Sequence, residues 1–263
     1  MNNYLNIYDS LEKKLVYNFK IGDGGIGDLI KFFMFLLNIG IKYNIKIYYL
    51  INNIPIEKYL KLNNEKMYIR KDEILNNAIE IYNYFDIQNI NSNHYYIIKP
   101  YLFYDSFSFS DLNIPFQEVF NFSNEVKINT LVLNDKSNYI SIHLRLGDKF
   151  LETDRNYVLC KEDVRNYNEN NIFNFIENNS NKNIYFFCDN YSYKLKIKEK
   201  YSNIIITYYD IGHTSLSNTT EQQVLNTLKE FYLLTNSEHI YIASNSGFSK
   251  VASKFKNIPI TEI

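Results

Sequence analysis

The sequence alternates short β-rich apolar runs with amphipathic stretches, and this alternation constrains the fold more than any other feature. It occurs over residues 15–51 and again over residues 139–255. Parallel strands need crossover connections of about a dozen residues or more, and these are usually helices. The alternation is therefore typical of parallel sheets covered by helices, and it predicts an α/β fold.

Two such cycles indicate two domains. The 263 residues suffice for two domains of about 130 each. A polar run at residues 134–138 separates two β-rich segments and marks the boundary. We predict two Rossmann-like domains, residues 1–135 and residues 136–263.

The individual elements follow from the same patterns. For the first domain we predict a strand at 15–21, a glycine turn at 22–27, a helix at 28–43, a strand at 45–51, a helix near 72–84 and a strand at 95–99. For the second we predict strands at 139–146, 183–188, 204–208 and 239–243, with helices at 171–178, 192–201, 221–235 and 248–255.

Composition and charge exclude several classes of protein. Lys and Arg number 28 against 29 Asp and Glu, so no broad cationic surface is available for a nucleic acid partner. The start of the chain lacks a signal-peptide pattern, and no apolar run approaches the roughly 20 residues of a membrane span. We expect a soluble, cytoplasmic protein without a transmembrane segment. Cys160 and Cys188 lack disulfide or zinc spacing and are expected in the core.

Polar residues at the exit of the strand at 139–146 suggest an anion site. Alternation with period two puts His143 and Arg145 on one face of the strand. A guanidinium suits a phosphate, the imidazole adds a second donor, and Gly147 permits a tight turn toward a ligand. The alternative is a structural ion pair between Arg145 and Asp148 beside a core His143, and both interpretations fit the pattern.

Two further strand exits carry polar side chains. The apolar strand at 183–188 ends in Asp189 and Asn190, which can hydrogen-bond a base or a sugar hydroxyl, or cap the following helix. The strand at 239–243 is followed by small polar residues that open a helix, and we favour an anion site there over simple capping by Ser246. The residues of that loop are Ser244, Asn245, Ser246, Gly247, Phe248 and Ser249.

The glycine turn near the N-terminus offers a different class of function. Gly22-Asp-Gly24-Gly25-Ile-Gly27 matches G-x-G-x-x-G between a strand and a helix, as in an NAD(P)-binding oxidoreductase. That fingerprint also needs an acid at the end of the next strand, where Ile51-Asn52-Asn53 supplies none. The chain also lacks an Asp-x-Asp motif, the usual ligand set of a metal-bridged nucleotide-sugar site. We therefore predict an anion site without a metal or other cofactor.

The three strand exits together resemble those of the GT-B fucosyltransferases, namely the α1,2-, α1,6- and protein O-fucosyltransferase groups. His143-Leu-Arg145-Leu-Gly-Asp148 is similar to their H-x-R-x-x-D element, and Tyr185-Phe-Phe-Cys-Asp189 to their strand ending in S/T-D. Residues 220–249 resemble their helix, strand and serine-rich phosphate loop. Gly24-Gly-Ile-Gly27-Asp28 is similar to the G-G-x-G-N turn of the α1,2 group, with Asp28 in the Asn position.

This resemblance implies a GT-B fold, in which two parallel sheets face each other across a cleft. It also implies inverting, metal-independent transfer of a sugar from a nucleotide-sugar donor to a hydroxyl of a glycan acceptor, with GDP-fucose as the usual donor. The first domain would be the acceptor side and the second would bind the donor. Donors carrying rhamnose, xylose or another hexose are the alternative.

The resemblance further implies roles for particular residues. Arg145 and the helix start after Ser246 would stabilise negative charge on the leaving phosphate, and His143 would position the pyrophosphate. Asp28 or Asp148 is the candidate catalytic base for the acceptor hydroxyl. The predicted donor-binding residues are Gly25, Gly27, His143, Arg145, Asp189, Asn190, His213, Ser244, Asn245, Ser246, Gly247, Phe248 and Ser249.

Overall fold

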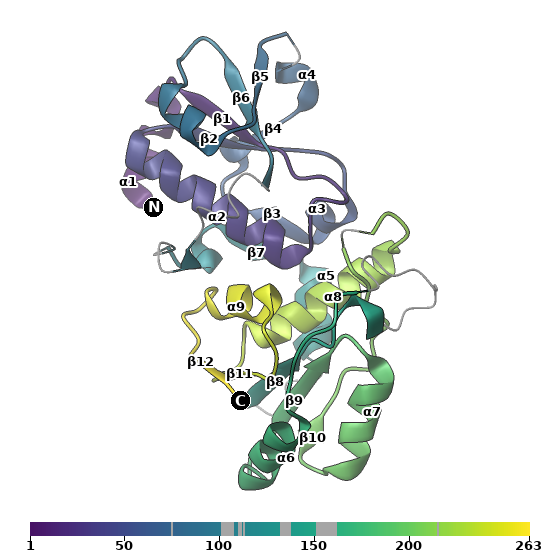
Figure 1. The fold of residues 1–263 in the computed structure, drawn as a ribbon. Coiled ribbons are helices and arrows are strands. Elements are labelled where there is room, and N and C mark those ends of the chain that lie inside the picture. Colours follow the sequence, from purple (N-terminus) through teal and green to yellow (C-terminus); the bar gives the residue numbers. More distant parts are fainter. Residues whose placement is uncertain are drawn as a thin grey trace. The chain divides into compact units, whose positions relative to one another are not determined.

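The chain forms two compact units, Met1–Asn121 and Phe122–Ile263 (Figure 1). Each contains a five-stranded sheet in which every neighbouring pair of strands is parallel. The predicted α/β class and the two Rossmann-like sheets are confirmed. The computed structural model describes residues 1–74, 76–100, 108–109, 112, 114–131, 138–150, 162–214 and 216–263. The predicted boundary at residues 135 and 136 lies outside these ranges, and so does Cys160.

The sheet of the first unit has the strand order β4-β2-β1-β6-β5. Its strands are β1 (Lys14–Tyr17), β2 (Lys46–Leu50), β4 (Tyr68–Ile69), β5 (Ala78–Ile81) and β6 (Tyr95–Ile98). Its helices are α1 (Asn2–Ile7), α2 (Ile26–Tyr43), α3 (Pro55–Tyr59) and α4 (Lys71–Ile74). A short strand β3 (Leu60–Leu62) pairs with β7 (Phe120–Phe122).

Helix α2 is the main helix of this unit, and local sequence sets both of its ends. The side chain of Asp28 accepts the backbone N–H of Gly25 at 3.0 Å, which satisfies one of the free donors at the helix start. Asn44 ends the helix in the left-handed conformation with φ 54°, and its N–H donates to the carbonyl of Gly40. Most side chains between these ends are buried.

The helix predicted at 72–84 is wrong. Of the described residues in this range, 72–74 alone are α-helical, in α4, and residues 78–81 form strand β5 instead. Three of the four residues of β5 are exposed, so the strand carries little hydrophobic periodicity of its own. Its conformation is set by parallel pairing with β6, in which Ala78 lies opposite Tyr95. Such long-range pairing leaves no local pattern in the sequence.

The second unit has the strand order β10-β9-β8-β11-β12. Its strands are β8 (Ile140–Leu144), β9 (Ile184–Cys188), β10 (Ile204–Ile205), β11 (Ile240–Ile242) and β12 (Ile260–Glu262). Its helices are α5 (Asn124–Leu131), α6 (Glu169–Asn178), α7 (Tyr191–Lys200), α8 (Glu221–Leu234) and α9 (Gly247–Ser253). A 3-10 turn, η7 (Asp148–Phe150), follows β8.

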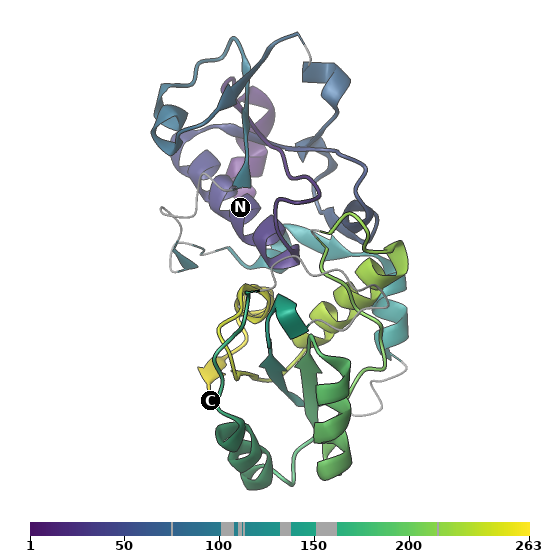
Figure 2. The ribbon, with the colours of Figure 1, turned by 45° about the vertical axis from the view of Figure 1, so that its right-hand side comes forward.

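Helices cover both faces of this sheet (Figure 2). On one face Ile142 of β8 and its neighbour Phe186 of β9 belong to a core that includes Ile176 of α6 and Ile197 of α7. The opposite face carries His143, whose ring stacks on Phe248 of α9 at a centroid distance of 5.4 Å. The predicted alternation along β8 is therefore observed, with an apolar face and a face that leads to polar residues.

None of the helices in the described part of the chain is long and apolar enough to cross a bilayer. Cys188 is buried at the end of β9, as expected, and burial raises the pKa of its thiol.

Gly40 allows α2 to approach β2 closely. A Cβ at this position would lie 2.4 Å from Cγ1 of Ile47 and 2.8 Å from the carbonyl oxygen of Ile45. We therefore expect Gly40→Ala to lower the free energy of unfolding by about 1–3 kcal/mol, although alanine is the better helix former by about 1 kcal/mol. Thermal unfolding followed by circular dichroism measures the effect.

Gly247→Ala is the matched control, because a Cβ at Gly247, the first residue of α9, meets no atom within 4 Å. We expect its unfolding temperature to equal or exceed that of the wild type. Equal stability of the Gly40→Ala variant and the wild type would contradict the close approach of α2 to β2.

Candidate functional site

A cavity lies at the carboxyl edge of the second sheet, where ligands bind in open parallel sheets. The cavity has a volume of about 90 Å³. Its walls come from the ends of β8 and β9, the loop after β10, and helices α8 and α9. The lining residues are His143, Arg145, Asp148, Cys188, Asp189, Ile211, Gly212, His213, Thr227, Glu230, Ser246 and Phe248.

Seven of the predicted site residues line this cavity, and others lie near it in the chain. Asn190 follows β9, Ser244 and Asn245 lie between β11 and α9, and Gly247 and Ser249 lie in the first turn of α9. Gly25, Gly27 and Asp28 belong to the first unit. The seven lining residues are His143, Arg145, Asp148, Asp189, His213, Ser246 and Phe248.

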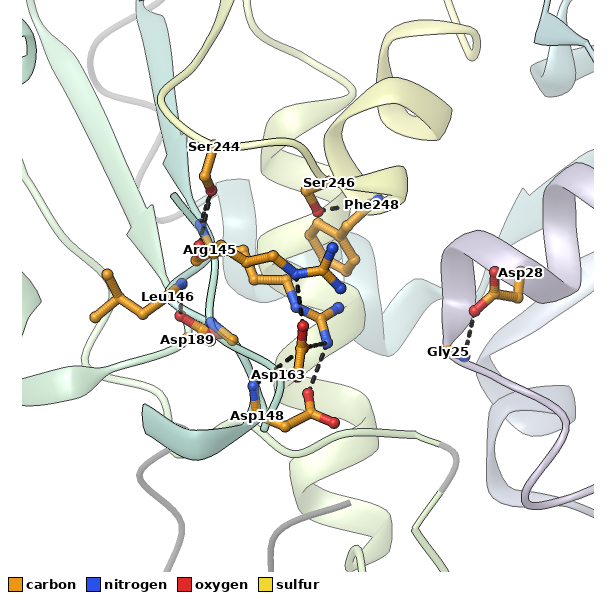
Figure 3. Close-up of polar contacts among 12 residues, drawn as sticks. Gly25, Asp28, Arg145, Leu146, Asp148, Asp163, Asp189, Ser244, Ser246 and Phe248 are labelled. Carbon is orange, nitrogen blue, oxygen red and sulfur yellow. Dashed lines mark hydrogen bonds and ion pairs between the residues drawn. The ribbon is translucent and has the colours of Figure 1, made fainter. Parts of the chain in front are cut away.

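Arg145 is the charged centre of the cavity (Figure 3). Its Nη2 donates to Oδ1 of Asp148 at 2.6 Å and to Oδ2 of Asp163 at 3.1 Å. Its Nε is buried and has no hydrogen-bond partner among the described residues. The Arg145–Asp148 ion pair, which the sequence left open as a structural alternative, is thus present. The ion pair uses one nitrogen of the guanidinium, Nη2, so Arg145 can form the pair and contact a ligand at the same time.

The backbone of Arg145 is held by Ser244, which follows β11. Ser244 Oγ accepts the N–H of Arg145 at 2.8 Å and donates to its carbonyl oxygen at 2.8 Å. A single hydroxyl therefore continues the pairing of β8 and β11 beyond the last residues of the two strands. This contact fixes where the guanidinium leaves the sheet.

Asp163 is a part of the site that the sequence analysis missed. Its Oδ2 also accepts the backbone N–H of Asp148 at 3.2 Å, and its Oδ1 lies 2.8 Å from Nε of Arg165. Burial raises the pKa of Asp163, but the Asp148 N–H and the two arginines outweigh this and lower it. Arginine is scarce in this chain, so the Asp163-Val-Arg165 pair was the signal available.

Asp189 holds the turn that follows β8. Its Oδ1 accepts the N–H of Leu146 at 2.8 Å and its Oδ2 accepts that of Gly147 at 3.1 Å. Gly147 has φ +107°, and a Cβ there would lie 2.2 Å from the carbonyl oxygen of Asp163. Only glycine fits this turn. Burial raises the pKa of Asp189, and the two N–H donors offset part of that effect.

The capping role considered for Asn190 is the one observed. Its Oδ1 accepts the N–H of Tyr193 at 2.7 Å, which caps α7, and its Nδ2 donates to the carbonyl of Phe150 at 2.8 Å. Both polar atoms of this amide are therefore used within the protein.

The polar residues at the start of α9 also make internal contacts. Ser246 Oγ caps the helix by accepting the N–H of Phe248 at 3.3 Å, and Ser249 Oγ donates to the carbonyl of Ser246 at 3.3 Å. The amide oxygen of Asn245 accepts from Lys250 at 2.9 Å. Ser246 lines the cavity, so its cap sits at the cavity wall.

Helix α8 presents a buried polar stripe with spacing i, i+3, i+4 and i+7. Asn226 Nδ2 donates to the carbonyl of Asp210 at 2.9 Å, and Thr227 Oγ1 accepts the N–H of Gly212 at 3.1 Å. These bonds hold the loop that carries His213 against the helix. The members of the stripe are Gln223, Asn226, Thr227 and Glu230, each less than 10% exposed.

Glu230, the last residue of the stripe, lines the cavity. The residues that bond to its carboxylate do not line the cavity. Lys194 Nζ donates to Oε1 of Glu230 at 2.9 Å, and the Thr207 hydroxyl donates to the same oxygen. No residue in the described ranges donates to Oε2. The sequence analysis did not select Glu230, although a polar stripe at helical spacing was the signal for it.

The glycine turn of the first unit leads directly into helix α2. Gly24 has φ +130°, and a Cβ there would lie 2.6 Å from the side chain of Asp28. Asp28 caps α2 through Gly25 (Figure 3). It also pairs with Lys31 at 2.7 Å. Gly27 is buried in the first turn of α2.

The position that an NAD site would fill with an acid is Asn52. Its Nδ2 donates to Oδ1 of Asn18 at 3.1 Å and to the carbonyl oxygens of Phe19 and Leu50 at 2.8 and 3.2 Å. Asn52 thus ties together the ends of β1 and β2. Across the described parts of both units, no group of three or more His, Cys, Asp or Glu residues is arranged to hold a metal ion.

Comparison with known proteins identifies the fold. No family model and no curated protein sequence matches the chain. Among solved structures, NodZ α-1,6-fucosyltransferase from Bradyrhizobium, soaked with GDP-fucose, matches with a TM-score of 0.60 at 11% identity over 95% of each chain. A variant of Arabidopsis thaliana FUT1 in complex with GDP gives 0.56 at 12% identity, over 100% of this chain and 74% of that one. POFUT1 in complex with GDP gives 0.55 at 8% identity, over 96% and 99%.

The predicted GT-B fucosyltransferase-like fold is thereby confirmed, because the NodZ fucosyltransferase, FUT1 and POFUT1 each match at least 95% of this chain in structure.

His143 is neutral in the folded protein. Burial, with the Arg145 charge in second place, lowers its pKa from 6.5 to about 3. Between these two values only the unfolded chain binds the proton, so the free energy of unfolding falls as the pH falls from 6.5 toward 3. Replacement by phenylalanine keeps a ring against Phe248 and removes the titrating group.

We therefore expect the unfolding temperature of the wild type to drop more than that of His143→Phe between about pH 7.5 and pH 5. Carboxylates titrate in both proteins and cancel in this comparison. Parallel pH profiles would show that His143 is protonated in the folded state.

Proposed function

We propose that this chain is an inverting, metal-independent glycosyltransferase that moves a sugar, L-fucose from GDP-fucose, to a hydroxyl of a glycan acceptor. The observation that carries the proposal is the cavity at the carboxyl edge of the second sheet, centred on Arg145, in a fold shared with fucosyltransferases solved with GDP or GDP-fucose. The donor would occupy this cavity. We expect the acceptor to be a glycan bound on the side of the first unit.

Arg145 would stabilise the leaving group. As the bond between the sugar and the β-phosphate breaks, negative charge grows on the phosphate, and a preorganised guanidinium stabilises this charge more than the ground state. Asp148 and Asp163 hold Nη2 of Arg145, which reduces the cost of ordering the side chain when the donor binds. This arrangement supports catalysis in which a fixed cation, without a metal ion, offsets the developing charge.

His143 would contact the donor as a neutral ring. Its Nδ1 is buried and has no partner among the described residues, so it is a candidate hydrogen-bonding group for the pyrophosphate or ribose. His213 also lines the cavity, on the loop held by α8. Ser246 and the N–H groups at the start of α9 would complete the phosphate contacts.

Glu230 is better suited than Asp189 or Asn190 to bind the base. Both oxygens of Asp189 accept backbone N–H groups, and Asn190 caps α7. Guanine presents two adjacent donors, N1–H and the 2-amino group, and a carboxylate accepts hydrogen bonds only. Uracil and thymine offer one donor, N3–H, between two carbonyl acceptors, and adenine offers its 6-amino group beside the acceptor N1. Glu230 lines the cavity with Oε2 still available, and guanine, with its two adjacent donors, is the base that suits this carboxylate best.

The acceptor hydroxyl needs a base in an inverting reaction. Asp148 is ion-paired with Arg145 and is 4% exposed, so it suits the positioning of Arg145 better than proton transfer. Asp28 of the first unit is also ion-paired, with Lys31, but its side chain is 26% exposed against 5% for Asp148, and we keep Asp28 as the proposed base.

Nucleotide binding is the first test, because a ligand of the native state raises its unfolding temperature. At a concentration of 100 times Kd the stabilisation is about 2.7 kcal/mol. We expect GDP and GDP-fucose to raise the unfolding temperature equally with and without EDTA, and UDP, TDP and NAD(H) to leave it unchanged. A shift with UDP or TDP alone would keep the fold and replace the donor, and a shift with NAD(H) alone would favour an oxidoreductase.

Arg145→Ala tests the phosphate contact. A charge-assisted hydrogen bond contributes about 1.5–3 kcal/mol, so we expect the Kd for GDP, measured by calorimetry, to rise about tenfold or more. Turnover of GDP-fucose should be lost. Arg70→Ala, an exposed arginine of the first unit, is the matched control and should bind GDP like the wild type. A folded Arg145→Ala variant with normal GDP affinity and turnover would refute the proposed site.

A further inference from the structure

We infer that Lys194 is a positioning residue that sets the base selectivity of the cavity, although it does not itself line the cavity. With Thr207 it holds Oε1 of Glu230 inside the protein and leaves Oε2 as the acceptor for the base. The inference rests on the proposed function, because it assigns the selection of a guanine nucleotide to this buried cluster.

Lys194, Thr207 and Glu230 come from three separate parts of the second unit. Lys194 lies on α7, Thr207 follows β10, and Glu230 lies on α8. Their exposed fractions are 1%, 2% and 3%, so the cluster is almost completely removed from water. Of the three, Glu230 alone lines the cavity. The carboxylate therefore connects an inaccessible ion pair with a site open to a ligand.

The hydrogen bonds of the cluster are unequally divided between the two carboxylate oxygens. Oε1 of Glu230 accepts from Lys194 Nζ at 2.9 Å and from the Thr207 hydroxyl. Lys194 Nζ also lies 3.5 Å from Oγ1 of Thr207. Two donors on one oxygen restrict rotation of the carboxylate about its terminal bond. Oε2 is then presented in one orientation, as selection between bases requires.

Compensation of the buried Glu230 carboxylate is a second role of Lys194 in this cluster. A carboxylate in a dry site is costly unless a cation compensates it, and removing one partner of a buried pair leaves the other uncompensated. Lys194 supplies this compensation from the protein side. The compensated group is a carboxylate, which only accepts hydrogen bonds, at the place where the base would bind.

The selection follows from what each base offers to such an oxygen. Guanine offers two adjacent donors, N1–H and the 2-amino group, and hypoxanthine offers N1–H alone. Adenine offers its 6-amino group, but the adjacent N1 is an acceptor that a carboxylate repels. We expect the wild type to bind GDP more tightly than inosine diphosphate, and inosine diphosphate more tightly than ADP. Lys194 does not touch the base, so it acts on this order only through Glu230.

The test measures Kd for GDP, inosine diphosphate and ADP by calorimetry on the full chain. We expect Lys194→Met to weaken GDP binding about tenfold or more and to reduce the ratio of GDP to ADP affinity by a similar factor. Lys194→Arg, which keeps the charge, should restore most of the selectivity. Lys196→Met removes a surface ion pair from the same helix, and we expect it to bind all three nucleotides like the wild type.

A double-mutant cycle separates this role from a general loss of stability. If Lys194 acts through Glu230, the double variant Lys194→Met, Glu230→Gln binds GDP no more weakly than Glu230→Gln alone. Additive losses would overturn the inference, and so would a Lys194→Met variant with wild-type affinity and selectivity. Should Lys194→Met fail to fold, Thr207→Val removes one donor to Oε1 without leaving a buried charge, and it must then lower the GDP-to-ADP ratio.

Failure of this inference differs from failure of the proposed function. If the wild type binds GDP and Arg145→Ala weakens it, but Lys194→Met and Thr207→Val leave selectivity intact, only the role of Lys194 is refuted. If the wild type binds none of the guanine nucleotides, the proposed function is refuted and this inference with it.

Discussion

The second unit depends on how β8 leaves its sheet. Backbone groups beyond the last paired residues of a strand need other partners, and here the neighbouring strands supply side chains. Ser244, after β11, bonds both backbone groups of Arg145, and Asp189, after β9, accepts the next two N–H groups. The exit of the central strand is therefore fixed from both sides. The Arg145 side chain starts from a backbone that neither solvent nor a ligand has to order.

Charge is balanced around that exit. Arg145 meets Asp148 and Asp163, and Asp163 also meets Arg165, so two cations and two anions are interleaved in a partly buried cluster. Buried charges are tolerated when they are paired in this way. The pairing also explains why Gly147 must be glycine, since the carbonyl of Asp163 takes the space of a side chain.

Much of this could be predicted from the sequence, because strand periodicity and strand exits are local properties. The face shared by His143 and Arg145 is one example, and the helix start after Ser246 is another. Asp163 was missed because it reaches Arg145 from 18 positions along the chain, a distance that no local pattern reports. The error at residues 78–81 has the same origin, since β5 exists only through its pairing with β6.

The sequence by itself determined the α/β class, the two sheets and the polar character of three strand exits, because hydrophobic periodicity and turn chemistry act over a few residues. Tertiary structure decided which exit residues remain available to a ligand. Asp189 and Asn190 are used by backbone groups around them, whereas Glu230 reaches the cavity with one oxygen occupied by Lys194, 36 positions away. Such assignments depend on which buried donors and acceptors meet once the helices pack against the sheet, and packing is a property of the whole unit.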